Sequence, residues 1–580
     1  MKTPDSAIVA AAQTWLGKQF DKETRKKVQQ LMDENPEELT DSFYRHLEFG
    51  TGGLRGIMGV GTNRMNKYTV GMATQGLANY VKKSFGEGTL KAAIAYDTRI
   101  NSPYFAQITA EVLSANGIQV FLFEDIRPTP ALSFAIRHLG CHTGVMITAS
   151  HNPKEYNGYK VYWNDGGQLV SPHDTNVIDE VKKIASPAEV NFNSDPALII
   201  KIGEEVDQAY VSAIKGLCLS PDAIERQKDF KIVFTPIHGT AVHLVPRCLK
   251  DFGFKNIYNI DAQDVPDGTF PTVKSPNPEE AEALTMALAK AREMDADIVM
   301  ATDPDGDRVG VAVKNNHGEF VLLNGNQTAS VLIWYLLHKW KEKDWLTGNE
   351  YIIKTIVTSE LLIKIAQHFQ VDSFDVLTGF KFIAEIIRQL EGKKKFIGGG
   401  EESYGYLVGD FVRDKDAVSA CCMIAEAAAW AADQGKLYFD LLIDIYVEFG
   451  FYKEKLLSVT KKGKAGAEAI AAMMDNFRRM PPQQIAGTRL ERIKDYLKQL
   501  EMNLTTGITQ PIDLPKSNVL QFFLADGSKI TVRPSGTEPK IKFYFGIKGE
   551  LTSAENFDKV DAEMEERINK IIEDMEITAP

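Results

Sequence analysis

Short apolar runs alternate with longer amphipathic stretches along most of the chain. Residues 144–147, 298–301 and 395–397 are runs of this kind, and each leads directly into a polar loop. Runs of this length favour buried strands, whereas the amphipathic stretches between them favour helices. The alternation of strands with helices predicts mainly parallel sheets with right-handed crossovers.

The pattern changes at about residue 451. The preceding segments repeat the alternation of strand and helix, whereas residues 519–524, 529–532 and 540–545 predict strands that follow one another closely. We therefore predict three α/β domains and a smaller C-terminal α+β domain that acts as a lid. The expected boundaries are residues 1–203, with a helical extension packed outside the first sheet, 204–318, 319–450 and 451–580.

Composition agrees with several soluble domains. The 580 residues are 44% hydrophobic, which is ample for several cores, and the net charge of −12 argues against a nucleic-acid partner. The five cysteines include no C-x-x-C pair and are expected to be reduced. Neither a signal peptide nor a long apolar span is apparent. These features predict a cytoplasmic protein without a membrane partner.

The stretch from Thr148 to Lys160 follows the strand predicted at residues 144–147. In open α/β sheets, ligands bind outside the carboxyl ends of the strands. Ser150 has a hydroxyl that can carry a phosphoryl group, His151 is a proton carrier beside it, and Pro153 favours a turn that holds the serine outward. Alone, such a stretch is by default an ordinary turn.

A second polar loop contains three alternating carboxylates, Asp303, Asp305 and Asp307, directly after the strand predicted at residues 298–301. Such carboxylates converge on a hard cation such as Mg²⁺. A calcium-binding EF-hand is excluded because its sixth and twelfth positions are Arg308 and Lys314 in place of glycine and glutamate. The remaining alternative is a solvated acidic turn, in which the three charges would repel one another.

Two further loops suit a sugar phosphate. Glycines before Glu401 and Ser403 let the backbone approach a ligand, and these two side chains suit neighbouring sugar hydroxyls. The segment from Arg533 to Thr537 offers a guanidinium, two hydroxyls and backbone N–H groups, which suit a phosphate that does not react. Its alternative is a hairpin connection. Upstream, Asp97 and Arg99 are expected either to support the serine loop or simply to hold the fold.

The four loops, in this order, resemble the α-D-phosphohexomutases, the phosphoglucomutase and phosphomannomutase superfamily. The resemblance runs from about residue 49 to about residue 544 and is strongest to bacterial phosphoglucomutases of the branch that also contains phosphopentomutase-like members. It implies four domains around a central cleft, three of them with mixed sheets. It also implies that Ser150 is a phosphoserine and that Mg²⁺ is held by Ser150, Asp303, Asp305 and Asp307.

The resemblance further implies a set of site residues. Ser150 is the catalytic phosphoryl carrier, and the candidates for the acid/base role, which the sequence does not rank, are His151, Lys160 and Arg55. The candidates for substrate binding are Thr378, Gly379, Glu401, Ser403, Lys415, Arg308, Arg533, Ser535, Gly536 and Thr537. Lys415 and Arg308 have simpler alternatives, a charge cluster at the start of a helix and an offset of carboxylate charge. His238, at a strand-to-helix turn, is expected to be a hydrogen-bonded structural residue.

The reaction implied is the interconversion of glucose 1-phosphate and glucose 6-phosphate, with glucose 1,6-bisphosphate as intermediate and activator. The Gly-Glu-Glu-Ser sequence that ends at Ser403 is typical of glucose-preferring members, and Gly405 replaces a histidine of the dual-specificity phosphomannomutases. Phosphomannomutase and phosphopentomutase activities stay as alternatives. A metal-dependent phosphatase and a phosphorylated non-catalytic binding protein are more distant ones. The expected partners are small sugar phosphates, and the protein is expected to be a monomer or a homodimer.

Overall fold

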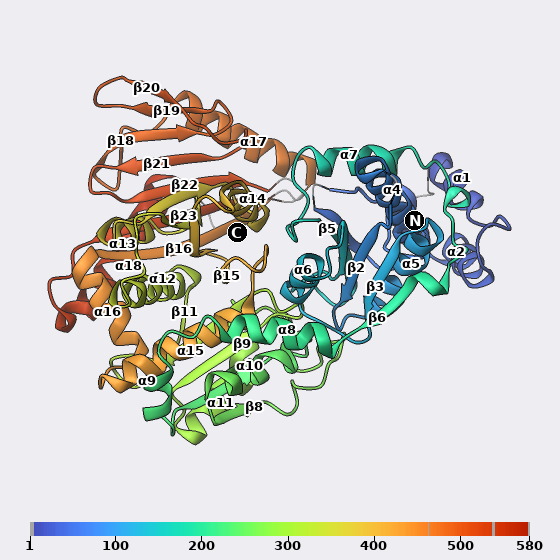
Figure 1. Cartoon of the computed structure of the whole chain (residues 1–580). Coiled ribbons are helices and arrows are strands. Elements are labelled where there is room, and N and C mark those ends of the chain that lie inside the picture. Colours follow the sequence, from blue (N-terminus) through green and yellow to red (C-terminus); the bar gives the residue numbers. More distant parts are fainter. Residues whose placement is uncertain (1–4, 51, 87, 462, 536–539, 578–580) are drawn as a thin grey trace. The chain divides into compact units, whose positions relative to one another are not determined.

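The computed structural model describes residues 5–50, 52–86, 88–461, 463–535 and 540–577 (Figure 1). By its internal contacts the chain forms two compact units. The first comprises Met1–Leu323, Phe380–Phe396 and Ser403–Gly435. The second comprises Asn324–Gly379, Ile397–Glu402 and Lys436–Pro580.

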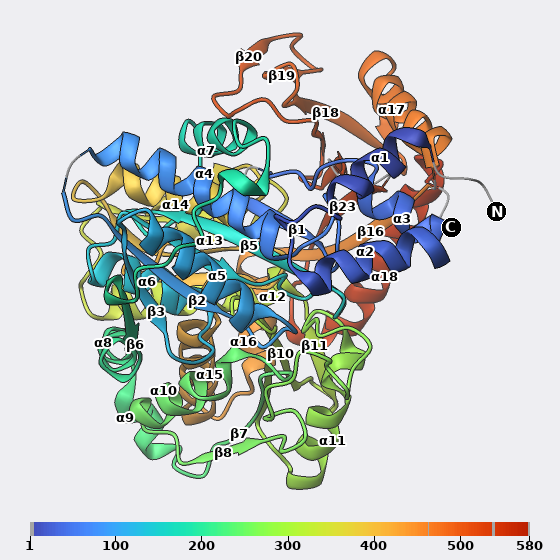
Figure 2. The same ribbon diagram turned by 90° about the vertical axis from the view of Figure 1, so that its right-hand side faces the viewer.

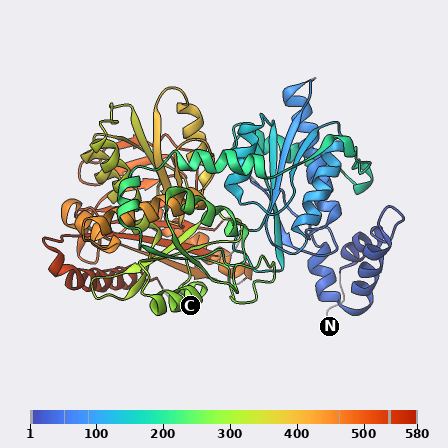
Figure 3. The same cartoon turned by 60° about the horizontal axis from the view of Figure 1, so that its bottom comes forward.

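Three N-terminal helices of the first unit share a small aromatic core. They are α1 (Ser6–Thr14), α2 (Lys22–Glu34) and α3 (Pro36–Phe43). Trp15 stacks on Phe20 and meets Phe43 and Tyr68 edge to face. Because Tyr68 belongs to α4 (Lys67–Phe85), which covers the first sheet, the cluster attaches the extension outside that sheet as predicted. Figure 3 shows these helices in dark blue as a group of their own.

A six-stranded mixed sheet forms the core of the N-terminal part of this unit. Its order is β1-β5-β4-β2-β3-β6, with parallel pairing among the last four strands and antiparallel pairing of β5 to both its neighbours. The helices α5 and α6 pack against β2 (Figure 2). The bounds are β1 (Gly53–Ile57), β2 (Lys91–Tyr96), β3 (Gln119–Phe123), β4 (Thr143–Ile147), β5 (Tyr156–Trp163), β6 (Ile199–Ile202), α5 (Ser102–Ala115), α6 (Thr129–His138) and α7 (His173–Lys182).

A second mixed sheet of the first unit has the order β11-β10-β9-β7-β8. Its central strand β9 is buried along its whole length, as its unbroken apolar sequence predicts. The strands are β7 (Lys231–Thr235), β8 (Asn256–Asn259), β9 (Ile298–Thr302), β10 (Val309–Lys314) and β11 (Phe320–Leu323). The remaining elements of the unit are α8 (Glu204–Lys215), α9 (Pro221–Arg226), α10 (Leu244–Phe252), α11 (Thr285–Met294), α14 (Phe380–Leu390), β15 (Gly405–Val408) and α15 (Ala417–Asp433).

The second unit begins with another α/β arrangement. Here β12 pairs in parallel with β13, and β14 lies on the other side of β12 in the same sheet. The bounds are β12 (Glu350–Thr355), β13 (Asp372–Val376), β14 (Lys395–Glu401), α12 (Gly325–Glu342), α13 (Leu361–His368) and α16 (Tyr438–Phe449).

The C-terminal sheet of the second unit is larger than the sequence predicts. Its order is β16-β23-β22-β21-β18-β19-β20, with β17 beside β18. The three predicted strands are present, but β16, β18, β19 and β20 were not predicted because polar side chains interrupt their apolar pattern. The bounds are β16 (Phe451–Thr460), β17 (Gln484–Ile485), β18 (Thr488–Asp495), β19 (Leu500–Asn503), β20 (Thr509–Pro511), β21 (Leu520–Leu524), β22 (Lys529–Pro534), β23 (Lys540–Gly549), α17 (Gly463–Arg479) and α18 (Phe557–Asp574).

The predicted fold class is confirmed: three α/β domains with mixed sheets precede a β-rich C-terminal domain that also carries helices. The domain boundaries given above stay predictions. Among the described residues, none of the helices has both the length and the apolar character needed to cross a membrane.

Gly53 provides a test of how β1 is held on β5. Its φ of +129° is in a region that side chains disfavour, and a Cβ there would lie 1.8 Å from the carbonyl oxygen of Tyr159. We expect Gly53→Ala to lower the free energy of unfolding by at least about 2 kcal/mol, measured by denaturant unfolding.

Gly50→Ala is the matched control, because a Cβ at Gly50 meets only the carbonyl oxygen of Gly53, at 3.6 Å. Equal stability of the two variants would show that the close approach at Gly53 does not limit the pairing of β1 with β5.

Candidate functional site

The loop between β4 and β5 holds Ser150 in a left-handed conformation, with φ of +51°. Its backbone N–H donates to Thr148 Oγ1 over 2.8 Å, and its side chain is almost fully buried. Ser150 Oγ donates to Asp303 Oδ2 over 2.7 Å, although 153 positions separate the two residues. The structure therefore brings the serine loop and the aspartate loop, which follow strands of two different sheets, into direct contact.

Arg99 fixes the shape of the serine loop from within the protein. Its buried guanidinium donates to the carbonyl oxygens of Ser150, Asn152, Pro153 and Tyr156. Asp97 lies 3.4 Å from Arg99 Nε and accepts hydrogen bonds from the Arg99 N–H and from a neighbouring serine hydroxyl. Of the two interpretations of this pair, the contacts favour support of the serine loop.

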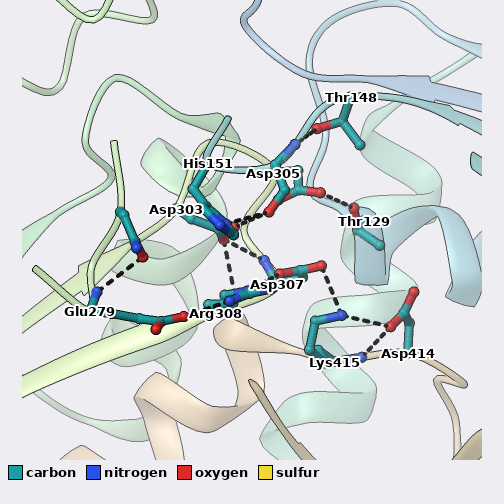
Figure 4. Close-up of polar contacts among 12 residues, drawn as sticks. Thr129, Thr148, His151, Glu279, Asp303, Asp305, Asp307, Arg308, Asp414 and Lys415 are labelled. Atoms are coloured by element: carbon teal, nitrogen blue, oxygen red, sulfur yellow. Dashed lines mark hydrogen bonds and ion pairs between the residues drawn. The ribbon is translucent and has the colours of Figure 1, made fainter. Parts of the chain in front are cut away.

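Asp303, Asp305 and Asp307 converge at the carboxyl end of β9 (Figure 4). One carboxylate oxygen from each lies within 4.8 Å of the others, and all three side chains are buried. Among the described residues, Asp305 Oδ1 and Asp307 Oδ1 have no hydrogen-bond partner. Burial, followed by repulsion from Asp305 and Asp307, raises the pKa of Asp303 well above its ordinary value. A hard cation with oxygen ligands fits this group.

Two ammonium groups flank the three aspartates. Lys160 Nζ lies 2.7 Å from Asp305 Oδ2 and 3.6 Å from Asp307 Oδ2, and Lys415 Nζ lies 3.2 Å from Asp307 Oδ2. Burial alone would raise the pKa of Asp305, but the attraction of Lys160, the hydrogen bonds to Asp303 and Lys160, and the charge of Lys415 together lower it. For Lys160, burial lowers the pKa, but the negative charges of Asp305, Asp307 and Asp414 together raise it above its ordinary value. The ammonium groups therefore offset part of the negative charge of the aspartates.

The other predicted catalytic residues lie around the same loop. His151 Nδ1 lies 3.2 Å from Ser150 Oγ, and Arg55 on β1 donates to Asn152 Oδ1 over 3.1 Å. Burial, followed by the positive charges of Arg308 and Arg55, lowers the pKa of His151 to about 2, so its imidazole is neutral. Arg308 forms an ion pair with Glu279, at 2.5 Å.

Asp414 is a neighbour of the site that the sequence did not single out. Its Oδ2 accepts from the Tyr162 hydroxyl over 2.7 Å and from Gln168 Nε2 over 2.8 Å, while its Oδ1 accepts from the backbone N–H of Lys415. Tyr162 follows Lys160 by two positions on β5, so both side chains point to the same face. The sequence spacing of Lys160 and Tyr162 could have indicated that Tyr162 faces the site, but it does not identify Asp414 as the partner of its hydroxyl.

Thr129 was also missed. It lies at the start of α6 and donates through Oγ1 to Asp305 Oδ2, while its N–H donates to the backbone carbonyl of Asp305. Nothing in its local sequence distinguishes it from other helix-start threonines. His238, by contrast, is confirmed as a hydrogen-bonded structural residue: its Nδ1 lies 2.8 Å from the Val265 carbonyl oxygen and its Nε2 lies 2.8 Å from Thr272 Oγ1.

The second unit carries most of the predicted substrate contacts. Glu401 Oε1 accepts from the backbone N–H of Gly379, which follows Thr378, and so joins two of the candidate segments. Arg533 lies on β22, and Ser535 donates its N–H to the Lys540 carbonyl. Ser403 belongs to the first unit and is the first residue of its segment Ser403–Gly435. Gly536 and Thr537 lie outside the described residues.

Comparisons with known proteins agree with this arrangement. Family models for the α/β/α domains I, II and III of phosphoglucomutase/phosphomannomutase match residues 46–188, 208–318 and 324–448. A phosphoglucomutase of Staphylococcus haemolyticus (strain JCSC1435) is 38% identical over 527 residues, which cover 90% of this chain and 93% of the relative. A phosphoglucomutase of Staphylococcus aureus (strain MRSA252) is 39% identical over 514 residues, which cover 88% and 91%.

Solved structures share the fold. The open form of pp63/parafusin, a phosphoglucomutase from Paramecium, has a TM-score of 0.66 at 18% identity and covers 91% of this chain and 96% of its own. A putative phosphomannomutase from Thermus thermophilus has a TM-score of 0.65 at 20% identity, with 90% and 99% covered. The chain belongs to the phosphoglucomutase/phosphomannomutase family. The predicted superfamily and the isomerase class of enzyme are thereby confirmed.

Tyr162→Phe tests whether Asp414 holds Lys415 in place. The substitution removes one donor to Asp414, and we expect the kcat of sugar-phosphate isomerisation to fall about tenfold, equal to about 1.4 kcal/mol, in a coupled assay. Tyr159→Phe is the control, because Tyr159 lies on the opposite face of β5 and its hydroxyl meets Thr74. Equal turnover of both variants would contradict a role of Asp414 in positioning Lys415.

Proposed function

We propose that this protein is a phosphoglucomutase, which interconverts glucose 1-phosphate and glucose 6-phosphate through a phosphoserine and a glucose 1,6-bisphosphate intermediate. The observation that carries the proposal is the contact of Ser150 Oγ with Asp303 Oδ2 at 2.7 Å, inside a group of three buried carboxylates, in a member of this family. Curated relatives that cover about nine tenths of the chain carry the same name.

Phosphoryl transfer needs positioning and charge neutralisation more than covalent help from the protein. Asp303, Asp305 and Asp307, together with a phosphoryl oxygen on Ser150, would hold Mg²⁺, which supplies neutralisation of the phosphoryl charge when bound. Arg99 keeps the serine loop in one conformation, so that Ser150 Oγ stays beside the carboxylates. Lys160 and Lys415 add positive charge at the same place.

The proton carriers differ in the states that the structure gives them. Lys160 is held as an ammonium by Asp305, so it is suited to donate a proton or a hydrogen bond. His151 is neutral and lies 3.2 Å from Ser150 Oγ, but a pKa of about 2 makes its imidazole a weak base, so the role it suits is a hydrogen bond to the serine rather than removal of its proton. Arg55 carries a guanidinium group, whose planar set of donors is suited to contact a phosphate.

Substrate recognition is divided among the other candidates. Glu401, Ser403, Thr378 and Gly379 are proposed to bind the sugar hydroxyls in both orientations of the bisphosphate. The phosphate that does not react is proposed to meet Arg533, Ser535, Gly536 and Thr537, with Lys415 and Arg308 beside the reacting one. An acidic protein, with a net charge of −12, needs such local cations to bind a dianion.

Glucose phosphates are the favoured substrates, with mannose and pentose phosphates as alternatives on the same machinery. Trace glucose 1,6-bisphosphate is proposed as the activator that maintains Ser150 in its phosphorylated form. The proposed setting is the cytoplasm, as a monomer or homodimer without nucleic-acid or membrane partners.

The proposal is tested by a coupled assay of glucose 6-phosphate formation from glucose 1-phosphate with Mg²⁺ and a trace of glucose 1,6-bisphosphate. We expect Ser150→Ala to lower turnover at least about 10³-fold while the protein stays folded, because the phosphoryl carrier is lost. Ser194→Ala, at an exposed serine, is the control and should keep full turnover.

Mannose and pentose phosphates are assayed in parallel. If one of them gave a higher kcat/KM than glucose 1-phosphate, it would replace the glucose phosphates as the proposed substrate. Release of free phosphate without isomerisation would indicate the phosphatase, and neither product would indicate the binding protein. Substantial isomerase activity in Ser150→Ala would contradict the assignment of Ser150.

A further inference from the structure

The second unit contains a cavity of about 690 Å³, and none of the predicted site residues that the structure describes lines it. One wall is the helix α13, whose residues Ile363, Lys364 and Gln367 recur at helical spacing and therefore share one face. Another part of the lining comes from β18, β19 and β21 in the C-terminal sheet. A volume of this size is within the range of small-molecule sites.

The sheet wall presents polar side chains in ordered rows. Asn503, Arg492 and Phe523 are cross-strand partners on β19, β18 and β21, and Arg492 lies over the Phe523 ring at 4.1 Å from its centroid. In the next row, Glu501 faces Lys494. The pairing of β18 with β21 shifts between Leu490 and Arg492, and such a bulge re-aims side chains. Glu491, at this irregularity, also lines the cavity.

Two buried lysines lie behind the cavity. Lys529 Nζ is 2.5 Å from Glu360 Oε1 and also donates to the carbonyl oxygens of Ile356 and Thr358. Lys354 Nζ is 3.1 Å from the same Glu360 oxygen and 2.9 Å from Asp375 Oδ1. Both lysines are almost fully buried, whereas Glu360 and Asp375 line the cavity. The two lining carboxylates are therefore already neutralised from behind.

The charges that remain are positive. Glu501 pairs with both Arg492 and Lys494, and the Glu491 carboxylate pairs with Arg489 outside the cavity. Among the described residues, the cavity-lining Lys364 and Lys548 take part in no ion pair. Lys364 lies on the helix α13 and Lys548 lies on the strand β23, so the two lysines come from different elements. A positive excess in a protein of net charge −12 attracts anions to this cavity.

We propose that this cavity binds a small polyanion, such as a phosphate ester or a polycarboxylate, whose anionic groups meet Lys364 and Lys548. The site is separate from Arg533, the described residue that begins the predicted phosphate loop. Lys529, behind the cavity, and Arg533 lie at opposite ends of β22, about 13 Å apart at the rise of an extended strand. Ala525 and Gly527, which line the cavity, precede β22, whereas Arg533 lies near its far end.

The test is calorimetric titration of the full chain with inorganic pyrophosphate and, separately, with citrate, at matched ionic strength and without divalent metal. The variant is Lys364→Ala/Lys548→Ala. The control, Lys559→Ala/Lys570→Ala, removes the same charge from two exposed lysines of α18 in the same unit. Binding at the predicted phosphate loop would be equal in all three proteins, so only a component that depends on Lys364 and Lys548 reports on the cavity.

We expect the wild type and the control to bind with affinities within about twofold, and the Lys364/Lys548 variant to bind at least about tenfold more weakly. Pyrophosphate alone would identify a phosphate-ester site, citrate alone a polycarboxylate site, and both a site that selects charge. Binding that is equal in the variant and the control, or absent from the wild type at millimolar probe, would overturn the proposal. Melting curves that match between the two double variants exclude loss of folding as the cause.

Discussion

Three carboxylates packed into one buried loop are the constraint around which the first unit is arranged. Asp303, Asp305 and Asp307 repel one another in a medium that screens poorly, which raises the pKa of Asp303 and makes positive charge beside the loop stabilising. Lys160 and Lys415 supply part of it. Asp305 Oδ1 and Asp307 Oδ1, which have no hydrogen-bond partner among the described residues, are available to coordinate a hard cation.

The surrounding structure serves that arrangement by fixing distances. On β5, Lys160 and Tyr162 point to the same face, so one strand delivers an ammonium group to Asp305 and a hydroxyl to Asp414. Arg99 binds four carbonyl oxygens of the serine loop, which leaves Ser150 little freedom to move away from Asp303. Phosphoryl transfer depends mainly on positioning of this kind.

The sequence predicted the parts of the molecule in which local pattern and chemistry coincide. The strand at residues 144–147 and the polar loop after it were predicted from the sequence, and so were β9 and its three aspartates. An apolar run followed by a charged loop is a signal that lies within one short segment. The strands β18 and β19 were not predicted from the sequence, because Arg492, Lys494 and Glu501 interrupt their apolar pattern. The Asp414 contact was missed because it joins positions 252 residues apart.

The central claim is that the phosphoryl group of Ser150 and the cation held by the three aspartates share one site. The direct measurement is pulsed electron-nuclear double resonance of the phosphorylated protein with Mn²⁺ in place of Mg²⁺. The account predicts a strong ³¹P coupling of the kind given by direct coordination, present in the wild type and absent from Ser150→Ala, which should still bind Mn²⁺. A bound Mn²⁺ without ³¹P coupling in the phosphorylated wild type would contradict it.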